Sequence, residues 1–242
     1  MRYGVFSDVH SNLEALTAVL TALAGERVDR LLCGGDLVGY AADPEACVAA
    51  VRQAAHGVVA GNHDWAVAGR FPLDWFHETA QAALQWTAGR LSPATVAYLG
   101  ALPLTWQDEH VTVAHGTVHE PETFHYLLTM GQAEASFEVQ RTPVAFVGHT
   151  HVPVVFRREA DGAVRVQRDP VVHLQPGLRY LVNVGSVGQP RDHRPEAAYC
   201  VYDTAAARVE FKRVSYPLGI TQEKIRAAGL PARCAERLGQ GI

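Results

Sequence analysis

Five short apolar segments of this chain each run directly into side chains that can bind a metal ion, and this feature limits the possible folds most. Asp, Asn and His together supply the mixed oxygen and nitrogen donors that divalent cations bind. Each group follows a predicted strand, and ligands bind where the strands of an open α/β sheet end. Together the groups indicate a two-metal hydrolytic site. They are Asp8-Val9-His10, Gly34-Gly35-Asp36, Gly61-Asn62-His63-Asp64, His115-Gly116 and Gly148-His149-Thr150-His151.

The first third of the chain alternates between predicted strands and helices. A buried strand over Arg2–Phe6 precedes a helix that Ser11 and Glu14 open as a capping box. Asp43 is the N-cap of the next helix, which begins at Pro44. This alternation predicts parallel strands with helices packed on them. The apolar stripe of the first helix is Leu13, Leu16, Leu20 and Leu23, and the next two strands are Arg30–Cys33 and Gly57–Ala60.

The remainder of the chain predicts a helical insertion followed by a β-rich half. Residues 71–99 carry aromatic residues at helical spacing, among them Trp75 and Phe76, which could form an interface or a lid. Asp161-Gly162 between two alternating segments predicts a hairpin. No internal repeat or linker separates the parts, so we expect a single domain over residues 1–242. Further strands are predicted over 104–107, 111–114, 144–147, 154–158, 164–168, 180–184, 198–203 and 209–214, and helices over 121–140 and 220–228.

Composition and charge restrict the partners. The 242 residues are 48% apolar, which suffices for a substantial core. The net charge is −4, and no basic run exceeds two residues, which argues against binding long nucleic acid. The four cysteines are too dispersed for a zinc knuckle and suit a reducing compartment. With no leader and no apolar run of ~20 residues, we expect a cytoplasmic protein without membrane contact.

Spacing suggests how the candidate ligands share their cations. Asp8 and His10 lie two residues apart and can lean to one side, as can His149 and His151. The carboxylate of Asp36 can bridge two cations ~3.5–4 Å apart. Each group taken alone also has an ordinary explanation, such as a loop aspartate, a strand-end turn or a polar strand end at His115, but the five together favour the metal site.

Other residues could act on a substrate. His63 need not bind metal, because an imidazole with a reference pKa of ~6.5 suits a general acid. Asn62 offers a neutral oxygen ligand or a helix cap. Arg191 follows a glycine-rich loop and could hold a phosphate through two hydrogen bonds, or be a plain surface arginine. His119 and His125 lie just beyond the fourth group and could face the site.

In this order the five groups resemble the signature of the calcineurin-like metallophosphoesterases: Asp-x-His, Gly-Asp, Gly-Asn-His-Asp/Glu, His and Gly-His-x-His. Residues 183–191 resemble a loop of the small bacterial phosphodiesterase branch. The Asp-x-x-Asp-Arg-Gly of the protein phosphatases is incomplete after Asp36, since its second Asp and its Arg are absent. This departure counts against the serine/threonine phosphatase and symmetrical dinucleotide hydrolase branches. The resemblance implies a four-layer α/β/β/α sandwich with two mixed β-sheets and a helical insertion.

The resemblance also implies roles for individual residues. His63 would be the general acid or a substrate ligand, Asp64 would orient it, and Asn62 and Arg191 would contact the substrate. The cofactors would be two divalent metal ions, with manganese expected first and Fe, Zn, Co or Ni as alternatives. One cation would be held by Asp8, His10, Asp36 and His151, and the other by Asp36, Asn62, His115 and His149.

The expected activity is hydrolysis of a small phosphodiester, and also of phosphomonoesters, by a metal-bridging hydroxide that attacks phosphorus in line. Two other functions are compatible with the sequence: a non-catalytic scaffold with the same fold, and a nuclease acting on short nucleic acid. The sequence leaves open the physiological substrate, the oligomeric state and the acid that supports His63.

Overall fold

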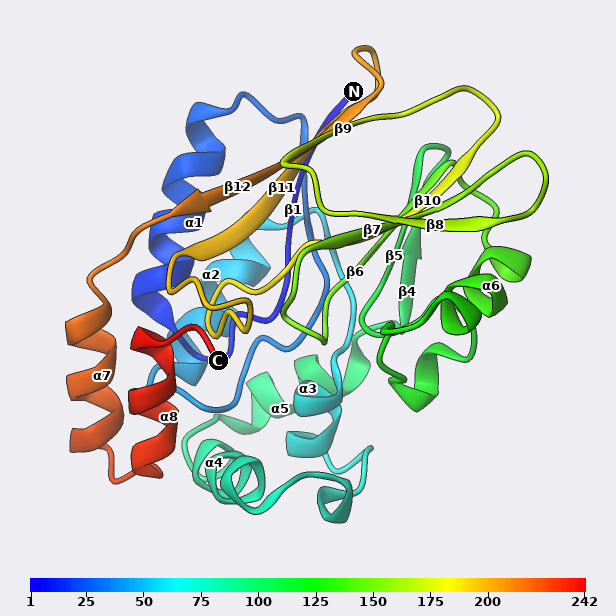
Figure 1. The fold of residues 1–242 in the computed structure, drawn as a ribbon. Coiled ribbons are helices and arrows are strands. Elements are labelled where there is room, and N and C mark those ends of the chain that lie inside the picture. The colour runs from blue at the N-terminus through cyan, green and yellow to red at the C-terminus, as the bar shows by residue number, and fades with distance from the viewer.

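The structure is a computed structural model that describes all of residues 1–242, and its framework is a pair of six-stranded sheets (Figure 1). The first sheet has the order β3-β2-β1-β11-β12-β9. Its strands are β1 (Arg2–Phe6), β2 (Arg30–Cys33), β3 (Gly57–Val58), β9 (Val171–His173), β11 (Ala197–Asp203) and β12 (Arg208–Val214). The second has the order β4-β5-β6-β10-β7-β8. Its strands are β4 (Thr105–Gln107), β5 (Val111–Ala114), β6 (Val144–Val147), β7 (Val154–Arg158), β8 (Val164–Gln167) and β10 (Arg179–Asn183).

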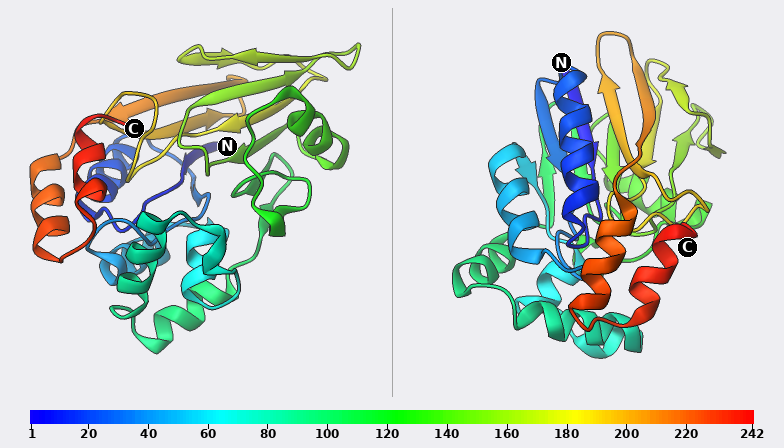
Figure 2. Two further views of the ribbon diagram at one scale, coloured as in Figure 1. Left: turned by 60° about the horizontal axis from the view of Figure 1, so that its bottom comes forward. Right: turned by 90° about the vertical axis from the view of Figure 1, so that its left-hand side faces the viewer.

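Helices cover the outer face of each sheet and one end of both (Figures 1 and 2). They are α1 (Leu13–Gly25), α2 (Pro44–Ala54), α3 (Asn62–Val67), α4 (Glu78–Ala88), α5 (Pro93–Ala101), α6 (Met130–Val139), α7 (Leu218–Ala227) and α8 (Ala232–Glu236). Three short 3-10 turns lie at Leu73–Trp75, Pro121–Thr123 and Arg237–Gly239. No helix combines the length and the apolar character needed to cross a membrane.

Strand alternation sorts the core into three apolar layers. Val5 of β1 and Phe146 of β6 point between the sheets, where they belong to one buried cluster. The neighbouring Phe6 belongs to the cluster under α1 and α2, and Ala145 belongs to the cluster under α6. The order of layers is therefore α1 and α2, first sheet, second sheet, α6. This confirms the four-layer α/β/β/α sandwich.

The sheet pairing brings the loops of the five motifs to one edge. β1 runs parallel to β2, and β2 runs parallel to β3. In the second sheet, β6 is parallel to both β5 and β10. The amide of His149 after β6 donates to the carboxylate of Asp8 after β1, at 3.0 Å, and so ties one sheet to the other. The antiparallel pairs β1–β11 and β10–β7 make both sheets mixed, as expected.

Some predicted elements were wrong in detail. The predicted capping box of Ser11 and Glu14 does not form: Asn12 caps α1 and accepts a hydrogen bond from the amide of Ala15 at 3.1 Å. Ser11 has a φ of 58°, whereas an N-cap residue normally lies in the β region. Glu14 bonds instead to Thr221 of α7. The predicted helix over residues 121–140 is confirmed only in its last part, as α6.

The predicted helical insertion is present as α4 and α5, with a 3-10 turn before them. Ala80 and Ala83 of α4 share a buried cluster with Ile225 of α7 and Leu238, whereas Leu99 of α5 belongs to the cluster under the first sheet. Tyr40, from the loop after β2, belongs to the same cluster. This third helical region therefore lies beside the motif loops.

Candidate metal centre

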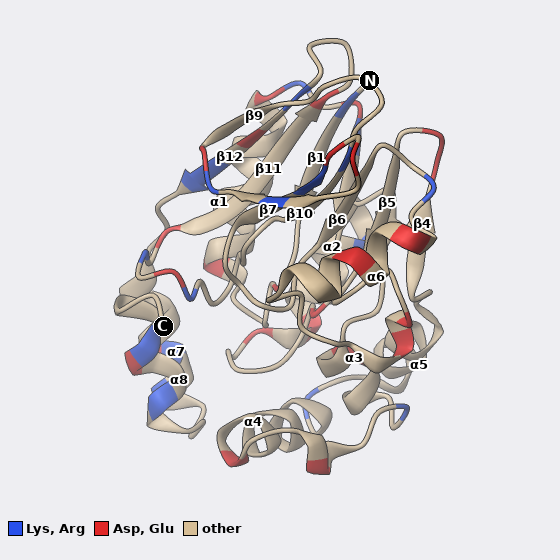
Figure 3. Ribbon diagram, turned by 45° about the vertical axis from the view of Figure 1, so that its right-hand side comes forward, with Lys and Arg blue, Asp and Glu red and all other residues tan.

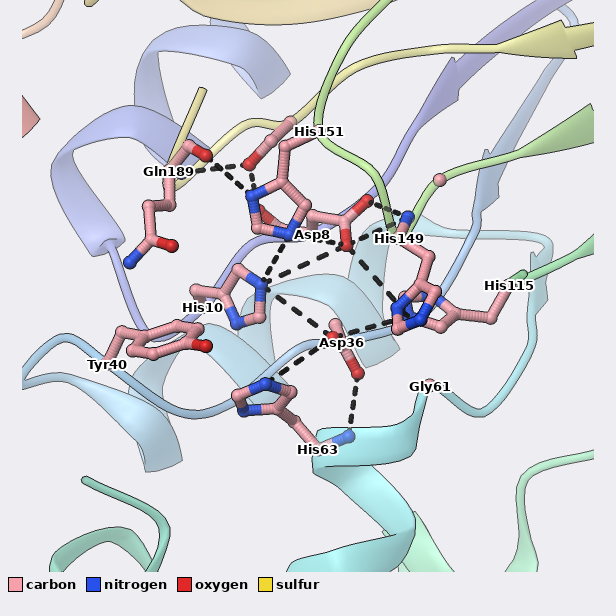
Figure 4. A network of polar contacts seen from close by, with 12 residues as sticks. Asp8, His10, Asp36, Tyr40, Gly61, His63, His115, His149, His151 and Gln189 are labelled. Atoms are coloured by element: carbon pink, nitrogen blue, oxygen red, sulfur yellow. Dashed lines mark hydrogen bonds and ion pairs between the residues drawn. The ribbon is translucent and has the colours of Figure 1, made fainter. Parts of the chain in front are cut away.

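All seven predicted metal ligands are buried, and they follow strands of both sheets; Figure 4 labels all of them except Asn62. Asp8 and His10 follow β1, Asp36 follows β2, and Asn62 opens α3; His115 follows β5, and His149 and His151 follow β6. Three groups have ligand atoms within 4.8 Å of one another: Asp8, His10 and His151; His10, Asp36 and His63; and Asp36, His115 and His149. The first group contains three of the four residues of one set that the resemblance implies, and the third contains three of the four residues of the other.

Hydrogen bonds fix which nitrogen of each imidazole faces inward. Nδ1 of His10, of His115 and of His151 each contacts a backbone carbonyl, at 3.1, 2.8 and 2.6 Å. A carbonyl only accepts hydrogen bonds, so each Nδ1 carries a proton. When the ring is neutral, its Nε2 is unprotonated and offers a lone pair. Backbone carbonyls orient metal-binding histidines in the same way.

Two pairs of ring nitrogens face one another across short distances. Nε2 of His10 lies 3.1 Å from Nε2 of His151, and Nε2 of His115 lies 3.1 Å from Nδ1 of His149. The unprotonated Nε2 atoms of His10 and His151 repel each other unless a cation lies between them, whereas the proton of His115 can bridge its contact with His149 until a cation replaces it. The oxygen of Asn62 is buried without a hydrogen-bond partner. This donor set fits divalent cations, which accept imidazole nitrogen together with carboxylate and amide oxygen.

The two carboxylates occupy central positions. Asp36 accepts a hydrogen bond from the amide of His63 at 2.9 Å and lies 3.3 Å from Nε2 of His115. Asp8 lies 3.1 Å from Nε2 of His151. Burial raises the pKa of Asp36, but the charges of His115 and His63 outweigh this effect and hold the pKa well below its usual range. Asp36 is therefore ionised and available to two cations.

Burial and charge set the protonation of the histidines. Burial lowers the pKa of His10, His149 and His151 well below the usual value, so these rings are neutral at pH 7. Burial also opposes the charge on His115, but the neighbouring Asp36 and Asp8 raise its pKa to about 9. A cation that binds His115 must therefore displace a proton.

Five of the seven candidate ligands have a left-handed backbone, with φ between 48° and 67°. This conformation costs roughly 1–2 kcal/mol for a residue other than glycine. Strain of this kind persists where the surrounding structure imposes it, and it clusters at functional sites. Here it turns side chains from the strand ends inward. The five residues are Asp8, His10, Asp36, His149 and His151.

Two glycines of the motifs are required by close packing around the carboxylates. A Cβ at position 61 would lie 2.0 Å from Oδ1 of Asp36, and one at position 148 would lie 2.2 Å from Oδ2 of Asp8. Because side chains are excluded there, the backbone amides of the following residues can reach the carboxylates. Glycine is therefore needed at positions 61 and 148 because any side chain there would clash with a carboxylate, and not only because the chain turns.

His63 and Asp64 lie at the first turn of α3, but they do not act as a pair. Asp64 accepts hydrogen bonds from the amides of Leu37 and Gly61, at 2.9 and 3.0 Å. Nδ1 of His63 has no partner, and its Nε2 lies 4.0 Å from Asp36. The predicted role of Asp64 in orienting His63 is therefore replaced by a structural one, in which it joins the loop after β2 to the start of α3.

The protonation of His63 also differs from the expectation of a charged general acid. Burial lowers its pKa to about 4, against the raising effect of Asp36, and Arg191 lowers it further. His63 is neutral at pH 7 in the substrate-free protein. A neutral imidazole still donates one N–H.

A cavity of about 290 Å³ opens onto this centre. Arg191 lines it, as predicted, and so does His125, whereas His119 does not. No motif in the sequence predicted that Arg237, in the last 3-10 turn of the chain, would line this cavity. Apart from Tyr40, the aromatic residues of the cavity wall lie in two segments that the sequence predicted as helical. The full lining is Asp36, Tyr40, Asn62, His63, Phe71, Trp75, Phe76, His77, Thr123, Phe124, His125, Tyr126, His149, His151, Arg191 and Arg237.

Comparison with known proteins places this site in a family. A sequence profile described as the calcineurin-like phosphoesterase superfamily domain matches residues 1–207. An uncharacterised protein of Methanocaldococcus jannaschii is 35% identical over 241 residues, 98% of this chain and 97% of that protein. A metallophosphoesterase from Sphaerobacter thermophilus is similar in structure, with a TM-score of 0.87 and 41% identity, covering 100% of this chain and 99% of that one.

A hypothetical protein from Pyrococcus horikoshii shares the fold at 20% identity, with a TM-score of 0.80 and coverage of 100% and 98%. Most of the chain matches the family profile, and buried Asp and His groups that could bind metal lie within the matched residues. The chain belongs to the calcineurin-like phosphoesterase superfamily.

Proposed function

We propose that this protein is a metal-dependent phosphodiesterase with a binuclear centre. The observation that carries the proposal is the pair of imidazole contacts on either side of Asp36, in which ring nitrogens face one another at 3.1 Å. One cation would relieve the repulsion between His10 and His151, a second would replace the proton between His115 and His149, and the carboxylate of Asp36 could bind both. Residues 1–242 would act as one domain, because the C-terminal Arg237 lines the same cavity as Asp36.

The residues would divide the work as follows. Asp8, His10, Asp36 and His151 would hold one cation, and Asp36, Asn62, His115 and His149 the other. When bound, two divalent cations supply an activated water near neutral pH and offset the charge of the phosphoryl oxygens. Manganese is the first candidate, and Fe, Zn, Co and Ni suit the same mixed donors.

His63 would donate its N–H to a phosphoryl or leaving oxygen. Its neutral ring packs against His10 and Tyr40, with centroids 4.7 and 4.8 Å away, which holds it beside the centre. The negative charge of a bound phosphoester would raise its pKa and favour the protonated form in the complex. Asn62 and Arg191, which also line the cavity, would contact the substrate.

A diester fits the cavity because both sides of the phosphoryl group can meet apolar surface. Phe76 and Phe124 contribute aromatic walls next to His63 and His115, with ring centroids 5.0 and 5.9 Å apart. An organic group on phosphorus gains from this contact, whereas a bare phosphate does not.

The test compares bis-p-nitrophenyl phosphate with p-nitrophenyl phosphate, using chelator-treated protein with and without Mn²⁺. We expect manganese-dependent turnover of the diester, lost in Asp36→Asn and kept in Asp161→Asn, a matched change at an exposed hairpin. Preference for the monoester would refute the diesterase. Protein that binds two cations per chain but hydrolyses neither compound would favour the non-catalytic scaffold.

A further inference from the structure

The cavity holds two arginines that pair with no Asp or Glu side chain. Arg191 and Arg237 are the only Lys or Arg residues in its lining, and neither takes part in an ion pair. Arg191 donates through Nε and a terminal nitrogen to the side-chain oxygen of Gln189, at 3.3 and 2.8 Å. Arg237 donates through Nε to the main-chain oxygen of Ile242. Both therefore keep terminal N–H groups without a protein acceptor.

Arg191 is tied directly to the metal centre, whereas Arg237 reaches the cavity from the C-terminal segment. The amide of Arg191 donates to the carbonyl of His151, at 3.3 Å, so this residue is adjacent to a candidate ligand. Arg237 belongs to the 3-10 turn after α8, in the C-terminal segment where Figure 3 shows basic residues on α7 and α8. The ring of Tyr40 packs against His10 at a centroid distance of 4.8 Å, and the same residue joins the C-terminal helices in a buried cluster.

The pKa shifts of the surrounding groups agree that Arg191, and not Arg237, acts on the metal ligands. After burial, the charge of Arg191 is the next cause that lowers the pKa of His151, beside the metal centre. Arg237 acts instead with Arg191 on Tyr40 and His77: burial raises the pKa of Tyr40 to about 12 and lowers that of His77, and both arginines lower each value. Burial lowers the pKa of Arg237 itself, and repulsion by Arg191 lowers it further. Two guanidinium groups are thus held near each other, with no Asp or Glu side chain paired to either.

The segment that carries Arg237 is firmly attached to the fold. Leu238, its neighbour, is buried in the cluster that contains Tyr40. On α7, Thr221 donates to Glu14 at 2.9 Å, and Lys224 pairs with Asp43 at 2.8 Å. The position of Arg237 is therefore imposed by core packing and by ion pairs to α1 and to the start of α2. It lies outside residues 1–207, which the family profile matches.

We propose that Arg191 and Arg237 form a second anion site, which binds a second phosphate group of the substrate. The cations of the metal centre would offset the charge of the phosphate that reacts, which leaves two further guanidinium groups in the same cavity free to bind an additional anion. Guanidinium groups suit phosphate because their N–H groups match its oxygens in pairs. This inference rests on the proposed function, and it names the substrate class as a small phosphoester that carries another phosphate.

The first test measures binding of inorganic phosphate to chelator-treated protein by calorimetry, so that no metal contributes. We expect Arg237→Gln to weaken binding at least ~10-fold, a loss of about 1.4 kcal/mol, and Arg237→Lys to keep part of it. Arg233→Gln is the matched control, because Arg233 is exposed on α8 and does not line the cavity. Equal binding by wild type and Arg237→Gln, no binding by wild type, or equal loss in the Lys and Gln variants would overturn the proposal.

The second test uses two chromogenic diesters with Mn²⁺-loaded protein: thymidine 5′-(4-nitrophenyl phosphate) and the same compound with a phosphate on its 3′ oxygen. We expect a higher kcat/KM for the second compound. Arg237→Gln should remove at least ~10-fold of that advantage, measured as the ratio of kcat/KM for the two compounds. Absence of any preference in the wild type would refute the second site. Failure to hydrolyse either compound would instead refute the proposed function, and the phosphate titration would still decide the anion site.

Discussion

Metal binding should release a proton from one half of the centre and none from the other. In the metal-free protein, Asp36 and Asp8 overcome burial and raise the pKa of His115 to about 9. The histidines of the other half, His10 and His151, have lowered pKa values and are already neutral. A cation binds only the unprotonated ring. Hence the site with His115 should bind more tightly as the pH rises, whereas the site with His10 and His151 should not change.

The size of the effect follows from the pKa of His115. At pH 7 about one ring in a hundred is unprotonated, so the apparent affinity is weakened ~100-fold, or ~3 kcal/mol. Affinity should rise about tenfold for each pH unit up to 9. The same shift contributes ~3 kcal/mol to the stability of the metal-free fold below the unfolded pKa of ~6.5, and this contribution is lost as the pH rises through 9.

Titration calorimetry with Mn²⁺ under nitrogen, in two buffers of different ionisation enthalpy, counts the protons released. Measurements at pH 7.5–8.5 lie above the pKa of Asp64, which burial raises to about 7. We expect about one proton for one of the two cations and none for the other. Two binding events without proton release, or affinities that stay constant between pH 7.5 and 8.5, would refute the reasoning.

Three further changes test the site and the core. His63→Ala should lower kcat ~10²-fold or more while metal analysis still finds two cations per chain; loss of the metals would make His63 a ligand instead. Gly61→Ala should reduce the metal content and kcat, because its Cβ would lie 2.0 Å from Oδ1 of Asp36, and full metal content would contradict this steric argument. Leu16→Ala should cost ~2–5 kcal/mol in urea unfolding, since Leu16 is fully buried under the first sheet. Leu13→Ala, on the partly buried side of α1, should cost clearly less, and equal losses would contradict the assigned packing.

Much of the site could be predicted because its signals are local. The candidate ligands stand directly after short apolar runs, and the parallel pairing of β1, β2 and β3 brings three of these ends together. The hairpin of β7 and β8 around Asp161-Gly162 was also predicted and is confirmed. In these cases the residue type and its place in the strand are sufficient, because alternation and turn chemistry act within a few residues.

Other assignments failed where two local explanations competed. Ser11 and Asn12 are both good N-cap residues. Asn12 caps α1 because Ser11 is held in a left-handed conformation within the motif loop. Asp64 looked like a partner for His63, yet two backbone amides occupy its carboxylate. The charge of His63 depends on burial, which the order of residues does not state.

The sequence by itself determined that each motif follows a strand, which donor atoms the motifs offer and which family they resemble, because these features depend on neighbouring residues. Only the tertiary structure decided that ring nitrogens meet at 3.1 Å and that His115 alone among the ligand histidines is held protonated. It also brought Arg237, 46 positions after Arg191, to the same cavity. The reason is physical: distances between remote segments come from the packing of whole layers, and the pKa of a buried group depends on every charge that this packing places around it.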